Sequence, residues 1–256
     1  MVVWNPAHYL HFTDHRLRPA LDLLARIAHP NPQLIHDVGC GPGNVTRIIA
    51  DRWPHARVVG SDISAPMLDV ARATYPTLEW ETIDVREWDP PEAPDVIYSN
   101  AVLHWVPHHD DTIRNMYSSL ADEGVLAIQM PLSSYEPARK LMAKTLADLD
   151  LLPELRPLVD QPDVASVEHY VELGLSLTET TDVWTTTYQQ RLSGPDPVFE
   201  WFNGSSLRRI RQALPDADRE RYDSAYKQAL HDTYPMRPDG STILPFPRLF
   251  IVLSKP

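Results

Sequence analysis

Residues 34–43, LIHDVGCGPG, join a short apolar run to three glycines at alternate positions, Gly39, Gly41 and Gly43. The chain is otherwise sparing with glycine, which accounts for only 9 of its 256 residues. Such a cluster indicates a backbone that turns tightly, or that a ligand approaches where a Cβ would block it. A helical pattern, NVTRIIADRW, follows directly at 44–53. We therefore predict a strand, a glycine turn and a helix, with the N–H groups of the helix start facing the crevice beyond the strand.

The same alternation of apolar runs and helical patterns extends along the rest of the chain. Further strands are expected at 56–62, 78–84, 95–100, 124–130, 177–192 and 241–253. Helices are expected at 14–28, 64–75, 112–124 and 164–174, with one more inside 131–165 and a mostly helical segment at 195–240. Strands that alternate with helices imply right-handed crossovers and a parallel sheet covered on both faces. The pattern therefore predicts an α/β fold with a doubly wound, mostly parallel, seven-stranded sheet.

The composition restricts the partners and the compartment of the protein. Acidic residues number 35 and basic residues 23, so the net charge of −12 disfavours a nucleic-acid partner. No apolar stretch approaches the roughly 20 residues of a membrane span, and the start MVVWNPAHYLHF lacks the features of a signal peptide. The single cysteine, Cys40, cannot form an internal disulfide, which agrees with a reducing compartment. We expect a cytoplasmic protein with no membrane, nucleic-acid or obligate protein partner.

The spacing around the glycine turn distinguishes between nucleotide ligands. The dinucleotide fingerprint G-x-G-x-x-G would require glycine at position 44, where this chain has Asn44. An acid, Asp62, stands at the end of the second expected strand, where it can accept both hydroxyls of a ribose. These features predict a nucleoside-bearing cofactor whose charged part need not be a pyrophosphate.

Four segments together resemble the successive motifs of class I S-adenosylmethionine-dependent methyltransferases. They are HDVGCGPGN at 36–44, GSDISAPML at 60–68, ETIDVREW at 81–88 and DVIYSNAVLHW at 95–105. The resemblance implies a Rossmann-like fold, S-adenosyl-L-methionine as the cofactor and S-adenosyl-L-homocysteine as its product. It also implies the residues that hold the cofactor: Asp37, Gly39, Gly41 and Gly43 for the methionine part, Asp62 for the ribose, Ile63 and Met67 for the adenine face, Asp84 and Val85 for the adenine edge, and Asn100, Ala101 and His104 for the sulfonium end.

The two ends of the chain extend this resemblance to one branch of the family. WNPAHYLHF at 4–12, VLAIQMP at 125–131 and FPRLFIV at 246–252 are similar to the methyltransferases that esterify a carboxylate of trans-aconitate, a small tricarboxylic acid. The resemblance implies one methyltransferase domain over 1–256. Its cofactor-binding core would be 30–131, and helical cap segments at 132–165 and 195–240 would select the substrate.

Methyl transfer to a carboxylate sets simple chemical demands. The acceptor is already ionised near neutral pH, so no general base is required. The carboxylates that do not react need cations, and planar bidentate recognition favours arginine. Our candidates are Arg16 and Arg248 for the substrate and Arg18 for the carboxylate of the cofactor. The alternatives are a structural ion pair for Arg248 and an exposed helix start for the other two.

The loop after the fourth expected strand holds further candidates. His104 is placed to donate a hydrogen bond to a substrate oxygen, whereas the neighbouring Trp105 is expected to pack in the core. The histidines near the N-terminus and in this loop match no known metal spacing, so no metal is expected. Two other functions remain open: a small-molecule methyltransferase with a different acceptor, and a non-catalytic S-adenosylmethionine-binding module.

Overall fold

The computed structural model describes residues 17–132, 136–159, 164–204 and 206–256. These residues form two compact units. Of the described residues, the core unit comprises 17–131, 165–185 and 248–256, and the second unit comprises 132, 136–159, 164, 186–204 and 206–247. No helix of the described residues is long and apolar enough to cross a membrane.

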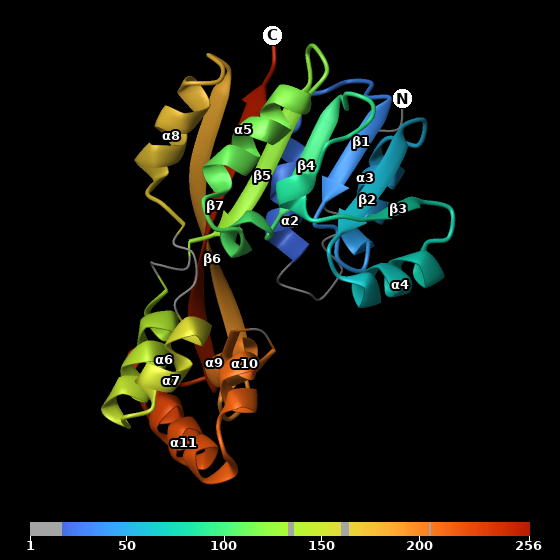
Figure 1. Cartoon of the computed structure of the whole chain (residues 1–256). Coiled ribbons are helices and arrows are strands. Elements are labelled where there is room, and N and C mark those ends of the chain that lie inside the picture. The colour runs from blue at the N-terminus through green and yellow to red at the C-terminus, as the bar shows by residue number, and fades with distance from the viewer. Residues whose placement is uncertain (1–16, 133–135, 160–163, 205) are drawn as a thin grey trace. The chain divides into compact units, whose positions relative to one another are not determined.

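The strands of the described residues form one sheet of seven, in the order β3-β2-β1-β4-β5-β7-β6 (Figure 1). They are β1 (Leu34–Val38), β2 (Arg57–Asp62), β3 (Glu79–Thr82), β4 (Val96–Asn100), β5 (Val125–Pro131), β6 (Thr181–Ser193) and β7 (Ser241–Ser254). The first five run parallel, and β7 pairs antiparallel with β5. The predicted doubly wound, mostly parallel, seven-stranded sheet is therefore confirmed.

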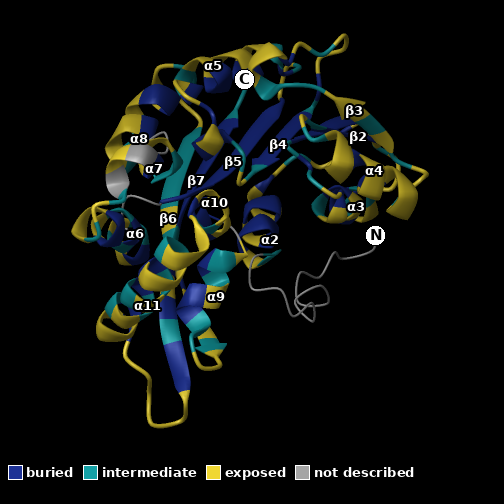
Figure 2. Ribbon diagram, turned by 60° about the horizontal axis from the view of Figure 1, so that its bottom comes forward, coloured by how far each residue is buried: buried dark blue, intermediate teal, exposed yellow. Residues whose placement is uncertain are grey.

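Helices cover both faces of the sheet in the core unit. They are α2 (Leu17–Arg26), α3 (Asn44–Arg52), α4 (Ala65–Thr74), α5 (His109–Ser119) and α8 (Val167–Leu175). Figure 1 shows α5 and α8 in front of the sheet and α2 and α3 behind it. The Tyr98 hydroxyl fixes α2 by donating to the carbonyl of Ala20 at 2.9 Å. Because β1, β4 and β5 are covered on both sides, all their interior positions are buried, as Figure 2 shows.

The second unit contains helices with a core of their own. They are α6 (Pro137–Asp148), α7 (Leu152–Val159), α9 (Pro197–Asn203), α10 (Ser206–Ala213) and α11 (Asp216–Thr233). Two stacked tyrosines of α11, Tyr222 and Tyr226, are buried in that core, and the Tyr226 hydroxyl donates to the carbonyl of Ala138. The segments 132–165 and 195–240 lie mostly within this unit, and their expected role in selecting the substrate stays a prediction.

Most element boundaries lie within a few residues of the predicted ones, with two corrections. The helix expected at 112–124 begins at His109 and ends at Ser119, because Asp110 and Asp111 favour the positive end of a helix dipole in its first turn. The segment 131–165 contains two helices where one was expected. Pro137 and Pro153 both lie in first turns, where proline is tolerated, so they begin helices instead of interrupting them.

Candidate functional site

The glycine turn between β1 and α3 has a backbone that other residues adopt only with strain. Gly39 has a φ of 81°, and a Cβ there would lie 2.0 Å from a methyl carbon of Val102. Gly41 has a φ of 56°, but a Cβ there would meet nothing of the described chain within 4 Å. The first glycine is therefore required by packing, whereas the second leaves an open space beside the backbone.

The N–H groups of the glycine turn itself bind within the protein. Gly39 and Cys40 both donate to the carbonyl of Ser61, at 2.7 and 2.9 Å. The N–H of Gly43 donates to the carbonyl of Cys40 at 3.1 Å. These bonds hold the turn against the end of β2, and the expectation that the N–H groups at the start of α3 face the crevice stays a prediction.

Asp62 ends β2 and fixes the turn from the other side. Its carboxylate accepts from the N–H of Gly41 at 2.9 Å and from the N–H of Ser64 at 2.8 Å. Ser64 is the residue before α4, so one carboxylate joins the glycine turn to the start of that helix. Asp62 is only half-buried and lines a cleft, which leaves part of the carboxylate accessible to a ligand.

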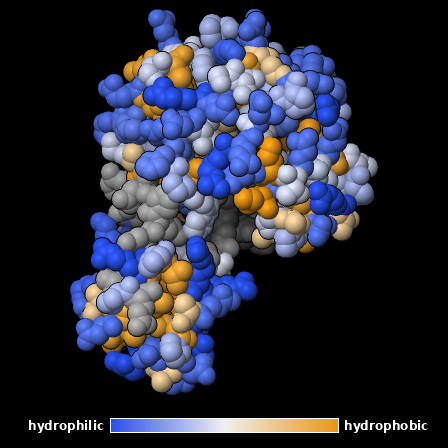
Figure 3. Space-filling view, in the orientation of Figure 1, coloured by the Kyte–Doolittle hydropathy of each residue, from blue (hydrophilic) through white to orange (hydrophobic). Residues whose placement is uncertain are grey.

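This cleft has a volume of about 580 Å³ and lies at the carboxyl ends of β1, β2 and β4. Eight of the residues expected to hold the cofactor line it: Gly39, Gly41, Asp62, Ile63, Met67, Asp84, Val85 and Ala101. Two of them are large apolar residues exposed at the cleft, Ile63 at 65% and Met67 at 47%. Large apolar side chains exposed in the wall of a cleft mark a place for an apolar ligand group, whereas the face of the core unit drawn in Figure 3 is mostly hydrophilic with a few hydrophobic patches.

The far side of the cleft carries an ion pair. Asp84 precedes a short 3-10 helix at Val85–Glu87 and accepts from the N–H of Arg86 at 2.9 Å. The Arg86 guanidinium also pairs with this carboxylate, and these contacts lower the pKa of Asp84. Arg86 lines the cleft as well, although the sequence argument did not single it out.

A second cavity of about 260 Å³ shares Gly39, Gly41 and Ala101 with the cleft. Asp37 lies in its wall, fully buried, and its carboxylate accepts from the Thr46 hydroxyl at 2.6 Å. Burial raises the pKa of Asp37 to about 7, and the charge of Asp62 adds to this effect. Asp37 forms no ion pair with a cationic side chain among the described residues, so the cavity holds a buried carboxyl group without such a partner.

Asn100 ends β4 in the wall of the same cavity. Its side-chain oxygen is buried and has no hydrogen-bond partner among the described residues. The next residue, Ala101, has a φ of 58°, a left-handed conformation that is costly for a residue with a Cβ. Both features lie where the two cavities meet, and strain of this kind is typical of functional sites.

The comparison with known proteins agrees with this geometry. Residues 9–172 match the model of a methyltransferase domain. A trans-aconitate 2-methyltransferase of Paracidovorax citrulli (strain AAC00-1) is 39% identical over 98% of this chain and 98% of its own length. Another, from Escherichia coli O7:K1 (strain IAI39 / ExPEC), is 36% identical with the same coverage of both chains. The chain belongs to the trans-aconitate 2-methyltransferase family.

A solved structure shows the same fold at lower identity. Phosphoethanolamine N-methyltransferase 2 of Haemonchus contortus, in complex with S-adenosyl-L-methionine, matches with a TM-score of 0.56 and 18% identity. The match covers 93% of this chain and 52% of that one. At this identity the likeness concerns the fold alone, which is that of the class I methyltransferases.

The loop after β4 differs from our expectation in this member of the trans-aconitate 2-methyltransferase family. Leu103–Trp105 form a short 3-10 helix, in which successive side chains point in different directions. Leu103 and His104 point inward and are buried, so Trp105 points outward, is 45% exposed and lines the cleft. The expected core packing of Trp105 is wrong. His104 packs beside its ring and is not among the described residues that line either cavity.

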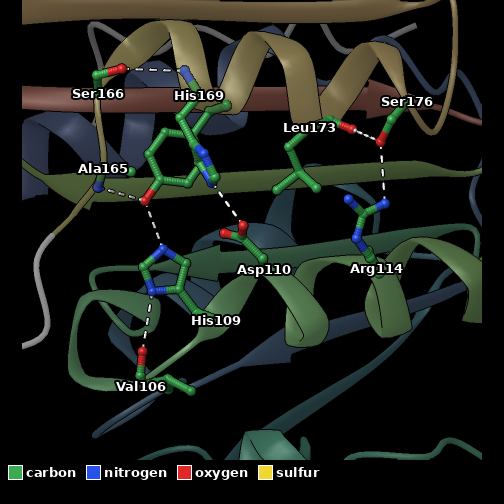
Figure 4. Close-up of polar contacts among 10 residues, drawn as sticks. Val106, His109, Asp110, Arg114, Ala165, Ser166, His169, Leu173 and Ser176 are labelled. Atoms are coloured by element: carbon green, nitrogen blue, oxygen red, sulfur yellow. Dashed lines mark hydrogen bonds and ion pairs between the residues drawn. The ribbon is translucent and has the colours of Figure 1, made fainter.

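A buried link holds the end of this loop to α8, as Figure 4 shows. The carbonyl of Val106, a cleft residue, lies 3.1 Å from Nδ1 of His109, which must therefore carry the proton. The other ring nitrogen, Nε2, then accepts from the Tyr170 hydroxyl at 2.7 Å. That hydroxyl accepts in turn from the N–H of Ala165 at 3.1 Å. The His109–Tyr170 link thus fixes one wall of the cleft from outside it.

Two of the three candidate arginines, Arg18 and Arg248, are not among the described residues that line the two cavities. Arg16 lies outside the described residues. Arg18 is exposed in the first turn of α2. Arg248 is 8% exposed in β7, in register with Pro131 of β5. Among the described residues no group of three or more potential metal ligands is present.

Proposed function

We propose that this protein transfers the methyl group of S-adenosylmethionine to a carboxylate of trans-aconitate, forming a monomethyl ester. The observation that carries the proposal is the similarity to trans-aconitate 2-methyltransferases along the full length of the chain. The cofactor site is common to many methyltransferases and does not specify the acceptor. The similarity outside the cofactor site therefore supports this particular substrate.

The residues of the two cavities fit S-adenosylmethionine. The open space at Gly41 would be filled by any Cβ, so the backbone there is bare where a ligand approaches. Asp37 is a buried carboxyl group that forms no ion pair within the described part of the chain, and it suits the ammonium group of a methionine. Asn100 offers a buried acceptor oxygen without a partner among the described residues. These three features lie together at the glycine turn and β4.

The nucleoside would occupy the larger cleft. Asp62 would accept the ribose hydroxyls, and Asp84 with Val85 would meet the edge of the adenine. Ile63 and Met67, with Trp105 in addition, would contact the faces of the base through apolar surface. When bound, the cofactor supplies a methyl group on a positively charged sulfur, which an oxygen nucleophile can attack.

The remaining task of the chain is to position the substrate and to exclude water. An ionised carboxylate needs no proton removed, so no general base is part of the proposed mechanism. Arg16 and Arg248 would bind the carboxylates that do not react, and Arg18 would bind the carboxylate of the cofactor. His104, whose ring is buried beside Trp105, would donate a hydrogen bond to a substrate oxygen.

In this proposal the core unit binds the cofactor, and segments mostly within the second unit select the substrate. All residues that line the two cavities fall between 17 and 107, which supports 30–131 as the main part of the cofactor-binding core. The segments 132–165 and 195–240 would then select the substrate.

A direct assay tests the proposal. Transfer of labelled methyl from S-adenosylmethionine should occur with trans-aconitate and more slowly with other tricarboxylates. Product with a different acceptor alone would overturn the substrate assignment, whereas cofactor binding without any product would indicate a non-catalytic binding module.

Replacement of each arginine tests its role. Arg16→Ala and Arg248→Ala should raise the KM for the acceptor, and Arg18→Ala the KM for the cofactor. Arg47→Ala, which removes only an exposed pair with Asp51, is the matched control and should leave both constants unchanged. If neither KM moves in a variant, that arginine has no binding role.

A further inference from the structure

Gln129 lies on the face of the sheet that carries the second cavity. In the register of the sheet, Asp37 is opposite Tyr98, and two residues further along β4 Asn100 is opposite Gln129. Side chains two residues apart on a strand lie on the same face, and so do those of residues paired in register. Asp37, Tyr98 and Asn100 line the second cavity, so Gln129 shares their face.

The backbone of Gln129 also touches the site directly. Its carbonyl accepts from the N–H of Ala101 at 2.9 Å, and Ala101 lines both cavities. Gln129 is therefore one strand further from the glycine turn than Asn100, at the carboxyl end of β5. This is the side of the site toward β7 and away from the residues that fit the cofactor.

The side chain of Gln129 is buried without satisfying its donor. The residue is only 2% exposed, and its amide nitrogen Nε2 has no hydrogen-bond partner among the described residues. A buried donor without a partner costs free energy, and it is rare in native structures unless a ligand or water completes it. The neighbouring unpartnered group, the oxygen of Asn100, is an acceptor. This face of the sheet thus presents the acceptor oxygen of Asn100 on β4 and, on the next strand β5, the donor N–H group of Gln129.

A cationic side chain shares the face on the next strand. Gln129 is opposite Phe250 of β7, and Arg248 is two residues from Phe250 and opposite Pro131. Arg248 therefore lies on the same face of the sheet as Gln129, at the level of Pro131, two residues further toward the end of β5. An amide N–H and a guanidinium on one face are both donors, and together they suit an anion with several oxygens, such as a carboxylate.

We propose that Gln129 binds a carboxylate of the tricarboxylate substrate through its side-chain N–H and so helps to set substrate specificity. This inference rests on the proposed function and adds a residue to its substrate site. The carboxylate bound by Gln129 is one that does not react, because a hydrogen bond to the attacking oxygen would lower its nucleophilicity. Gln129 has no role in binding the cofactor.

The variant Gln129→Met tests this inference, because methionine has a similar length and shape but no donor. Affinity for trans-aconitate, measured by calorimetry on the complex with S-adenosylhomocysteine, should fall about tenfold or more. The KM for trans-aconitate should rise by a similar factor, while kcat and the affinity for S-adenosylhomocysteine should stay within about twofold. Gln129→Glu, which places a like charge beside the substrate, should weaken trans-aconitate binding further.

Two further measurements separate a binding role from a structural one. The melting temperature of ligand-free Gln129→Met should be equal to that of the wild type or higher, since the change removes an unsatisfied donor. Ser99→Ala is the matched control, because the Ser99 hydroxyl is also buried and unpartnered in the described structure but lies on the opposite face of the sheet. It should leave the affinity for trans-aconitate unchanged.

The outcomes also separate this inference from the proposed function. Unchanged trans-aconitate affinity in Gln129→Met, with an active wild type, overturns the inference and leaves the proposed function standing. A loss of affinity accompanied by a lower melting temperature and weaker binding of S-adenosylhomocysteine assigns Gln129 to the structure of the site and also overturns the inference. If the wild-type protein neither binds nor methylates trans-aconitate, both fall.

Discussion

Replacement of Asp37 by asparagine should stabilise the ligand-free protein near neutral pH and at the same time weaken cofactor binding. Asp37 is fully buried, and its pKa is raised from 3.8 to about 7 mainly by burial. Between these two pH values the native carboxyl keeps a proton that the unfolded chain releases. The native state therefore binds more protons, and the contribution of Asp37 to stability falls as the pH rises from about 4 to about 7.

The magnitude follows from the difference between the two pKa values. Each pH unit in this interval costs about 1.4 kcal/mol, so the full loss approaches about 4 kcal/mol above pH 7. Asparagine stays neutral and keeps an oxygen that can accept from the Thr46 hydroxyl, so it escapes this cost. The free energy of unfolding of Asp37→Asn minus that of the wild type should therefore be constant in acid, rise with pH, and level off above about pH 7.

Urea unfolding of both proteins across this pH range measures the difference. Asp69→Asn, at an exposed carboxylate paired with Arg72, is the control and should not reproduce the gain in stability of Asp37→Asn at neutral pH. Thr46→Val removes the hydrogen bond that favours the charged form of Asp37, so the loss of stability should continue to higher pH. A flat difference for Asp37→Asn would refute the reasoning, because it would mean that Asp37 is ionised in the native protein throughout.

Cofactor binding should favour the ionised form of Asp37, whereas the ligand-free fold favours the protonated form. An ammonium group favours ionised Asp37, so the affinity of the wild type for S-adenosylhomocysteine should increase as the pH rises through about 7. Asp37→Asn should reduce this affinity about tenfold or more at pH 8 and remove its pH dependence near 7. Calorimetry at several pH values checks both points, and an unchanged affinity would exclude Asp37 from the cofactor site.

Three further predictions concern the cleft. Gly39→Ala should prevent stable folding or destabilise the protein strongly, because its Cβ would collide with the side chain of Val102. Gly41→Ala should lower the free energy of unfolding in urea by only about 1–2 kcal/mol and weaken the binding of S-adenosylhomocysteine. Equal stability of the two variants would contradict the assigned packing. Tyr170→Phe leaves Nε2 of His109 without its donor, so it should lower the free energy of unfolding by about 1–3 kcal/mol with only a small change in kcat. A change in kcat without a loss of stability would contradict a purely positioning role for this link. Trp105→Ala should raise the Kd for S-adenosylhomocysteine several-fold with little change in melting temperature, since the ring is half exposed; a large fall in melting temperature would show that it packs in the core after all.

The glycine turn and the carboxylates at the strand ends were accessible to sequence reasoning because they depend on local rules. A positive φ favours glycine, and the chain places Gly39 and Gly41 where such φ values occur. Asp62 and Asp84 follow strands of a parallel sheet, whose carboxyl ends meet at one edge. Their arrival at one cleft follows from topology, which the alternation of strands and helices already predicted.

The position of Trp105 could not be predicted in this way. Whether it faces the core or the cleft depends on the rotation of a three-residue helix, and no periodicity can be read from so short an element. Arg86 and the His109–Tyr170 link were missed for a related reason. The signal for Arg86 was its position two residues after Asp84, whereas Tyr170 is distant in sequence and had no local signal.

The sequence by itself determined the α/β fold, the order of its elements and the position of the glycine turn, because these follow from hydrophobic periodicity and from backbone rules at glycine. Only the tertiary structure decided that Asp37 is fully buried, and that the amide donor of Gln129 has no hydrogen-bond partner among the described residues. Burial and hydrogen-bond satisfaction are properties of the surroundings in space. They change the pKa of a carboxyl or leave an amide donor available, and neither effect can be read from the identity of the residue.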